Sequence, residues 1–253
     1  VDAGSVLAPE RSVWNPDTIT ALRDRWNDAE KVDGKSFIEN VALQLDGASD
    51  AEKLLMAEII ALQILPIASA IGHAKKTEKV HSVLALMEHP VSIPPVFDTA
   101  FGGGAFHPGT GMMSNVNRAI TLILNLAKEW VELAPDEQQA ALENPRAWRS
   151  FVQALEGEEF PTQRYSLMYL VHPGFFGPIV SKDHRKRIRQ AFIGEIGGQF
   201  SDDADDDLRR IAALTRPSTA EDWREVARTY NGPSYARNGY HTRLARAHAK
   251  WRG

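Results

Sequence analysis

Cysteine is absent from this chain of 253 residues. Without thiols the protein can form no disulfide framework, thiolate nucleophile or cysteine-ligated zinc site. The sequence also lacks a charged segment that leads into an apolar run, the pattern of a signal peptide. Both absences favour a cytoplasmic protein, because reducing compartments disfavour disulfides.

Long apolar runs are also missing. The longest, residues 59–71, is interrupted by Gln63, Pro66 and Ser69. A helix that crosses a bilayer needs roughly 20 apolar residues, so we expect no membrane span.

The sequence signatures of several enzyme classes are absent. We find no Gly-x-Ser-x-Gly elbow and no His-Glu-x-x-His motif. The eight histidines are scattered, and the acidic run Asp202–Asp207 lacks the central glycine and distal glutamate of a calcium loop. We therefore predict a non-catalytic chain without metal or cofactor, and we interpret the acidic run as a solvated helix start.

What the chain does have is a glycine-rich segment, FGGGAFHPGTGMMS, over Phe101–Ser114. It ends without the lysine of a phosphate-binding P-loop, and it lacks the third glycine and the preceding strand of a dinucleotide fingerprint. Two interpretations stay open. The segment is either a turn into the next helix or a recognition loop, in which Phe106 and His107 stack on a ligand and Thr110 lies at the helix start.

Apolar residues recur at helical spacing along most of the chain, with little alternation of period two. Prolines after polar residues, as at Asn15-Pro16, predict helix starts, and Ser49 with Glu52 predicts a capping box for a central helix over residues 50–65. Thr77 is predicted to cap the following helix. The sequence thus predicts an all-α, irregular bundle of roughly ten helices with at most a minor β-ribbon.

Glycines near residues 194–205 break the helical pattern. We place a domain boundary there. Residues 1–195 would form a helical recognition domain, and residues 196–253 a C-terminal helical extension.

Charge is distributed unevenly, although the net charge is only -4. A predicted helix from Lys182 is strongly basic, the acidic run follows it, and a second basic helix is predicted near the C-terminus. Basic side chains at three- and four-residue steps favour contacts with nucleic-acid phosphates. The candidate nucleic-acid-binding residues are Lys182, Arg185, Lys186, Arg189, Arg243, Arg246 and Lys250. The alternative is that the basic helix simply pairs with the acidic run.

Two blocks, Phe101–Trp130 and Gln163–Phe192, joined through Arg146–Leu155, carry a family pattern. A Pro-Gly-Thr-Gly loop and a long helix are followed by LVHPGFFGPIVSKDHRKRIRQAF. This pattern resembles the region before the motor domain in McrB-like AAA+ NTPases of prokaryotic restriction and phage-defence systems.

The resemblance implies an accessory module that is followed by a GTP- or ATP-hydrolysing motor and works with a McrC-like nuclease. No Walker lysine occurs in this chain, so we expect no NTP hydrolysis from it. The start at Val1 fits an N-terminal piece of a longer protein, which could form oligomers through its motor. The leading hypothesis is a module that binds nucleic acid, including modified DNA. The alternatives are a protein-interaction or regulatory module, which senses a phage protein or docks the motor, and an enzyme of unfamiliar type.

Overall fold

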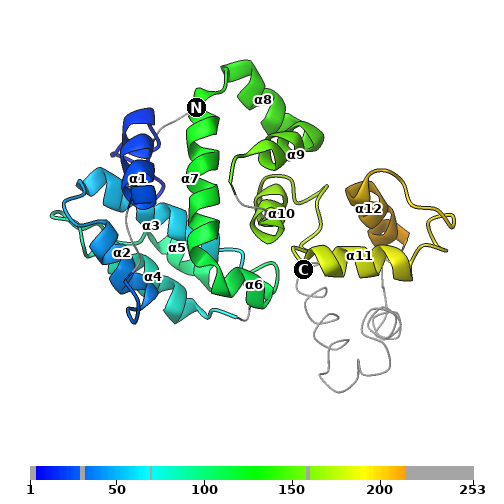
Figure 1. Ribbon diagram of the computed structural model, residues 1–253, viewed down its shortest axis with the longest axis horizontal. Helices are drawn as coiled ribbons and strands as arrows, with labels where there is room; N and C mark the ends of the chain where they lie inside the picture. Colours follow the sequence, from blue (N-terminus) through cyan, green and yellow to red (C-terminus); the bar gives the residue numbers. More distant parts are fainter. Residues whose placement is uncertain (1–3, 29–31, 69, 158–159, 215–253) are drawn as a thin grey trace. The chain divides into compact units, whose positions relative to one another are not determined.

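The computed structural model describes residues 4–28, 32–68, 70–157 and 160–214. The chain divides into two compact units, Val1–Pro173 and Gly174–Gly253 (Figure 1). The described residues form twelve helices, and their only β structure is two isolated bridges, Gly4 to Ser12 and Ile67 to Phe106. The predicted all-α fold is confirmed.

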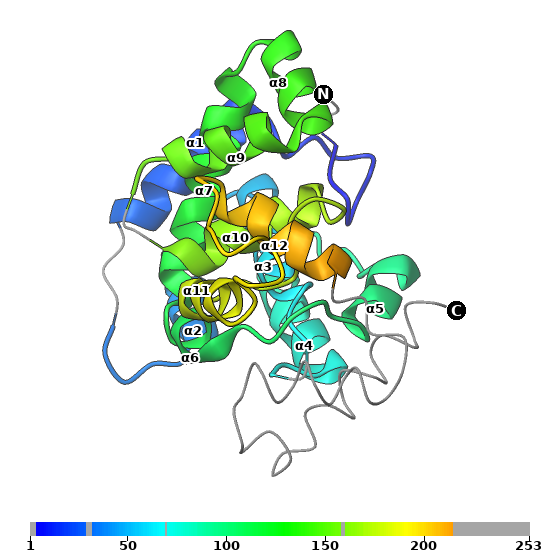
Figure 2. The same cartoon turned by 90° about the vertical axis from the view of Figure 1, so that its right-hand side faces the viewer.

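Three helices form the centre of the first unit: α1 (Pro16–Asp28), α3 (Asp50–Ile64) and α7 (Val116–Glu132). They contact one another pairwise (Figure 1). Helix α3 is buried around most of its circumference, as its apolar composition predicts, because other helices cover it on several sides. Helices α2 (Phe37–Gln44), α4 (His73–Leu84) and α5 (Pro95–Phe101) complete this part of the unit (Figure 2).

The rest of the first unit consists of α6 (Gly109–Ser114), α8 (Pro135–Glu143), α9 (Pro145–Ala154) and α10 (Pro161–Val171). Helix α9 packs on both α8 and α10. Each of these last three begins with proline, whose fixed φ suits the first helical position and whose missing N–H is not needed there.

The predicted caps are partly confirmed. Ser49 and Glu52 form a reciprocal capping box at α3. The prediction for α4 is wrong, because the helix begins at His73 after the N-cap Gly72. Thr77 lies one turn inside it, where its hydroxyl donates to the carboxylate of Asp98 at 3.3 Å.

The N-terminal arm is fixed to α3 over its described residues. The buried carboxylate of Glu58 accepts hydrogen bonds from the Ser5 hydroxyl, the Leu7 N–H and the Trp14 indole N–H. Since these partners lie 44 to 53 residues from Glu58 in the chain, no local pattern revealed them.

The second unit contains α11 (Lys182–Ala191) and α12 (Ala204–Leu214), which pack against each other. Phe192, Ile196 and Ile211 form a small buried cluster with Ile188 at its edge. The boundary predicted after residue 195 therefore lies inside this unit, because residues on both sides of it share one cluster. Among the residues that the structure describes, no helix is long and apolar enough to cross a membrane.

Candidate functional site: the basic helix and the glycine-rich loop

Helix α11 starts where the sequence predicts it. The Ser181 hydroxyl accepts a hydrogen bond from the His184 N–H, and Asp183 lies in the first turn, where a negative charge suits the helix dipole. The basic side chains that follow are divided between the interior of the unit and its surface.

Arg185 points into the second unit. Only 4% of the residue is exposed, and its guanidinium forms an ion pair with the carboxylate of Asp205, which is also buried. A second, longer hydrogen bond runs from Arg185 to the carbonyl oxygen of Ile179 at 3.4 Å. A buried arginine with a buried counter-charge is a structural ion pair.

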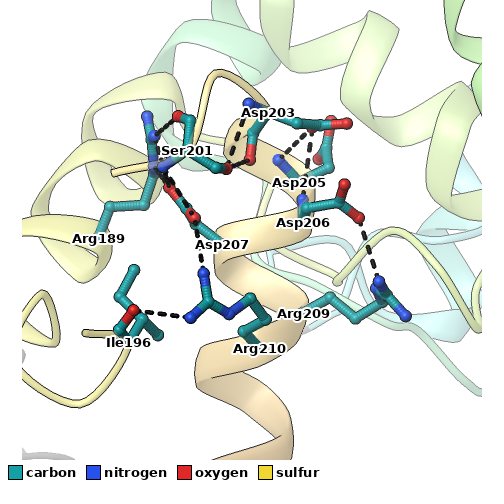
Figure 3. Close-up of polar contacts among 9 residues, drawn as sticks. All are labelled: Arg189, Ile196, Ser201, Asp203, Asp205, Asp206, Asp207, Arg209 and Arg210. Atoms are coloured by element: carbon teal, nitrogen blue, oxygen red, sulfur yellow. Dashed lines mark hydrogen bonds and ion pairs between the residues drawn. The ribbon is translucent and has the colours of Figure 1, made fainter. Parts of the chain in front are cut away.

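Arg189 lies one helical turn after Arg185 and binds Asp207, two residues after Asp205. Its Nε and one terminal nitrogen donate to a single carboxylate oxygen of Asp207, at 3.1 and 2.7 Å (Figure 3). The same terminal nitrogen also donates to the carbonyl oxygen of Ser201 at 3.1 Å.

The side chain of Asp207 is fully buried and also accepts hydrogen bonds from the Ser201 N–H. Burial by itself raises the pKa of this carboxyl, but the hydrogen bonds from Arg189 and Ser201 outweigh burial, so the net direction is downward. Asp207 is therefore held in its ionised form.

The acidic run is consequently more than the solvated helix start that the sequence predicted. Asp203 caps α12, because its carboxylate accepts the N–H groups of Asp205 and Asp206 (Figure 3). Asp205 and Asp207 supply the counter-charges of α11. The prediction of a solvated run is wrong for these two buried residues.

Two of the predicted nucleic-acid-binding residues are therefore already bound within the second unit. Arg185 and Arg189 are engaged by the acidic run, which is the alternative that the sequence left open. Lys182 and Lys186 are exposed on α11. Arg243, Arg246 and Lys250 lie outside the described residues.

Phe200 is a surface residue that the sequence analysis missed. Its side chain is 44% exposed, and the guanidinium carbon of Arg189 lies 4.7 Å from the centre of its ring. The sequence feature that could have indicated it is an aromatic residue that comes soon after Gly197 and Gly198, shortly after the basic helix.

The glycine-rich loop does not present the aromatic reader that was predicted. Phe106 is buried, its ring packs edge-on against Tyr169, and its backbone is hydrogen-bonded to Pro66 and Ala68. The proposed stacking role of Phe106 is therefore wrong, because its ring belongs to the interior. His107 and Thr110 are exposed, and His107 Nδ1 accepts the Gly109 N–H at 3.1 Å.

A buried lysine anchors this loop. The Lys76 ammonium donates to the carbonyl oxygens of Leu65 at 2.9 Å and Gly103 at 2.8 Å. Burial lowers the pKa of Lys76. The backbone of the next residue, Gly104, lies close to the backbone of Ala68, so that an added Cβ would lie 2.6 Å from the Ala68 Cα. The loop is thus fixed against the end of α3.

No cluster of three or more metal-ligating side chains occurs within the described ranges. The family model of N-acetylmuramidase matches residues 202–252, a small part of the chain that begins at the acidic run. No curated protein and no solved structure matches the chain.

Proposed function

We propose that this chain is a non-catalytic recognition module of a McrB-like restriction or phage-defence system, and that it recognises a protein. The observation that carries the choice of protein over nucleic acid is the engagement of Arg185 and Arg189 by buried carboxylates. Releasing either arginine for a phosphate would leave a buried aspartate without its counter-charge, which costs several kcal/mol.

Over residues 1–214, the charge balance supports the same choice. Residues 174–214 contain seven lysines and arginines and seven aspartates and glutamates. Residues 1–173 contain 14 basic and 23 acidic residues of these types. A surface that binds phosphate backbones needs a local excess of positive charge, and neither of these two stretches has an overall excess. Residues 215–253, with eight lysines and arginines and three aspartates and glutamates, do have one.

The N-acetylmuramidase match supports a different activity, the cleavage of peptidoglycan glycans. Most glycosidases use two carboxyl groups, one of them a general acid whose pKa is raised. Asp207 lies in the part of the match that the structure describes. Its pKa is lowered rather than raised, and its carboxylate is ion-paired with Arg189. Other carboxyl groups of the matched range, such as those of Glu221 and Asp222, would have to supply this activity.

Binding measurements with four probes test the proposed function. The purified chain is titrated with the AAA+ motor of the McrB-like system, with its McrC-like nuclease, and with plain and modified DNA duplexes over a salt series. It is also incubated with peptidoglycan. We expect saturable binding to the motor or the nuclease, with at most weak DNA binding that disappears at moderate salt.

Two results would overturn the proposal. Tight binding to DNA with no binding to either protein would restore the nucleic-acid hypothesis. Release of glycan fragments from peptidoglycan, lost on the double substitution Glu221→Gln and Asp222→Asn, would make the chain a hydrolase.

A further inference from the structure

Two polar side chains of α10, those of Gln163 and Ser166, are completely buried, each with 0% exposure. Among the residues that the structure describes, neither the oxygen nor the nitrogen of the Gln163 carboxamide has a hydrogen-bond partner, and the Ser166 hydroxyl has none. Folding removes such groups from water, which is costly unless a new hydrogen bond replaces the lost ones. Buried polar groups are therefore nearly always bonded, and these two side chains need a partner.

Comparable side chains of the first unit bind the backbone. Gln138, which is buried in α8, donates to the carbonyl oxygen of Trp130 at 2.7 Å. The Ser82 hydroxyl donates to the carbonyl oxygen of Glu78, four residues earlier in α4, at 2.8 Å. Such a bond is open to any serine inside a helix, yet Ser166 makes none. The pair on α10 thus differs from these side chains in having no protein partner.

The two side chains are neighbours on one side of the helix. Residues three apart on an α-helix have about 5–6 Å between their Cβ atoms. One small molecule can therefore reach both the Gln163 carboxamide and the Ser166 hydroxyl.

The chemistry of the pair limits what this molecule can be. The carboxamide oxygen accepts a hydrogen bond, the carboxamide nitrogen donates one, and the hydroxyl can do either. The carboxamide N–H groups disfavour a metal cation, and the carboxamide oxygen disfavours an anion. The ligand must therefore be neutral, must both donate and accept, and must be small enough to be enclosed with the two side chains. Water meets these requirements.

We infer that Gln163 and Ser166 form an internal water site, in which one water molecule bridges the carboxamide and the hydroxyl. A buried water typically makes about three hydrogen bonds, and globular proteins hold on the order of one such water per 27 residues. The site lies on α10, which contacts α9 and α6. The bridging water is thus a structural component of the first unit, and this inference is independent of the partner that the chain recognises.

A high-resolution crystal structure of the full chain tests the site directly. We expect an ordered water within about 2.7–3.2 Å of the Gln163 carboxamide and of the Ser166 hydroxyl oxygen. A direct hydrogen bond between the two side chains, or a different molecule in this place, would overturn the inference.

Thermal unfolding of the full chain gives an independent test in solution, with Gln138→Met as the matched control. The control removes a donor whose acceptor is known, so it should lower the melting temperature of the first unit. Gln163→Met should also lower it, by about 2–4 °C, because the bridging water loses its partner. An amide without any partner would behave in the opposite way. A higher melting temperature for Gln163→Met would therefore contradict the water site.

A double substitution tests whether one water serves both side chains, and circular dichroism checks that each variant keeps its helix content. Ser166→Ala should lower the melting temperature less in the Gln163→Met background than in the wild-type chain, because the water is already weakened there. Fully additive shifts would mean that the two side chains share no water, which would overturn the proposed bridge.

Discussion

Asp207 is the residue on which the second unit depends most. Its buried carboxylate binds Arg189 and the Ser201 N–H, so it joins α11, α12 and the loop between them. We expect Asp207→Asn to lower the free energy of unfolding of this unit by about 3 kcal/mol, because Arg189 would lose its counter-charge. Urea unfolding followed by circular dichroism measures the change.

Asp206→Asn is the matched control, since Asp206 contacts the exposed Arg209 one turn away on the same helix. An exposed pair of this kind contributes at most about 1 kcal/mol. Equal losses in the two variants would contradict the assigned role of Asp207.

Asp207 also makes the stability of the fold depend on pH. The pKa of Asp207 in the folded chain lies below its ordinary value of 3.8, so the ionised carboxylate stabilises the fold above that value. This contribution is lost as the pH falls from 3.8 through the lowered pKa. The wild-type chain should therefore lose more stability on acidification than Asp207→Asn does, which urea unfolding at pH 7 and pH 3 would show.

At the scale of elements, the glycine-rich loop is a fixed part of the first unit. Gly104 has no room for a side chain, because an added Cβ would lie 2.6 Å from both the Ala68 Cα and the Ile67 carbonyl oxygen. Both contacts are with backbone, which cannot rotate away. We expect Gly104→Ala to cost about 1–3 kcal/mol, as overpacking does, and to lower the melting temperature by several degrees.

Gly103→Ala provides the comparison within the same loop. Its added Cβ would meet only the Ala100 carbonyl oxygen at 3.4 Å, an ordinary contact. The two melting temperatures should differ clearly, and equal values would mean that the loop can move away from Ala68.

Local patterns predicted most of the elements. Apolar spacing, Pro16 and Pro145 at helix starts and the Ser49 capping box all act within a few residues, so the sequence displays them directly. The start of α4 was missed because Gly72, which has no side chain to form a cap, occupies the N-cap instead of Thr77.

The candidate site was less predictable, since its contacts are not local. Arg185 and Asp205 are 20 residues apart, and the sequence could not decide between a solvent-facing arginine and this ion pair. The ring of Phe106 packs against Tyr169, which lies even more residues away in the chain. Such contacts depend on how helices pack, which periodicity leaves undetermined.

At the scale of the whole molecule, the chain divides after Pro173 into two compact units, and each such unit is expected to fold by itself. The central helices of the first unit, α1, α3 and α7, contact one another pairwise. We expect a chain of residues 1–173 to be helical and to unfold cooperatively, with a midpoint close to that of the same transition in the full chain. Thermal and urea unfolding would show this, and a fragment without a cooperative transition would contradict it.

A chain that ends at residue 195 makes the sharper comparison, because it includes α11 without α12. Arg185 and Arg189 then lack Asp205 and Asp207, and Phe192 loses Ile211 from its cluster. An isolated helix of about ten residues is unstable in water, so residues 174–195 should be unfolded in this fragment. Limited proteolysis should trim it back to about residue 173 and leave the full chain intact between α11 and α12. Equal protection of α11 in both chains would show that its fold does not depend on the acidic run.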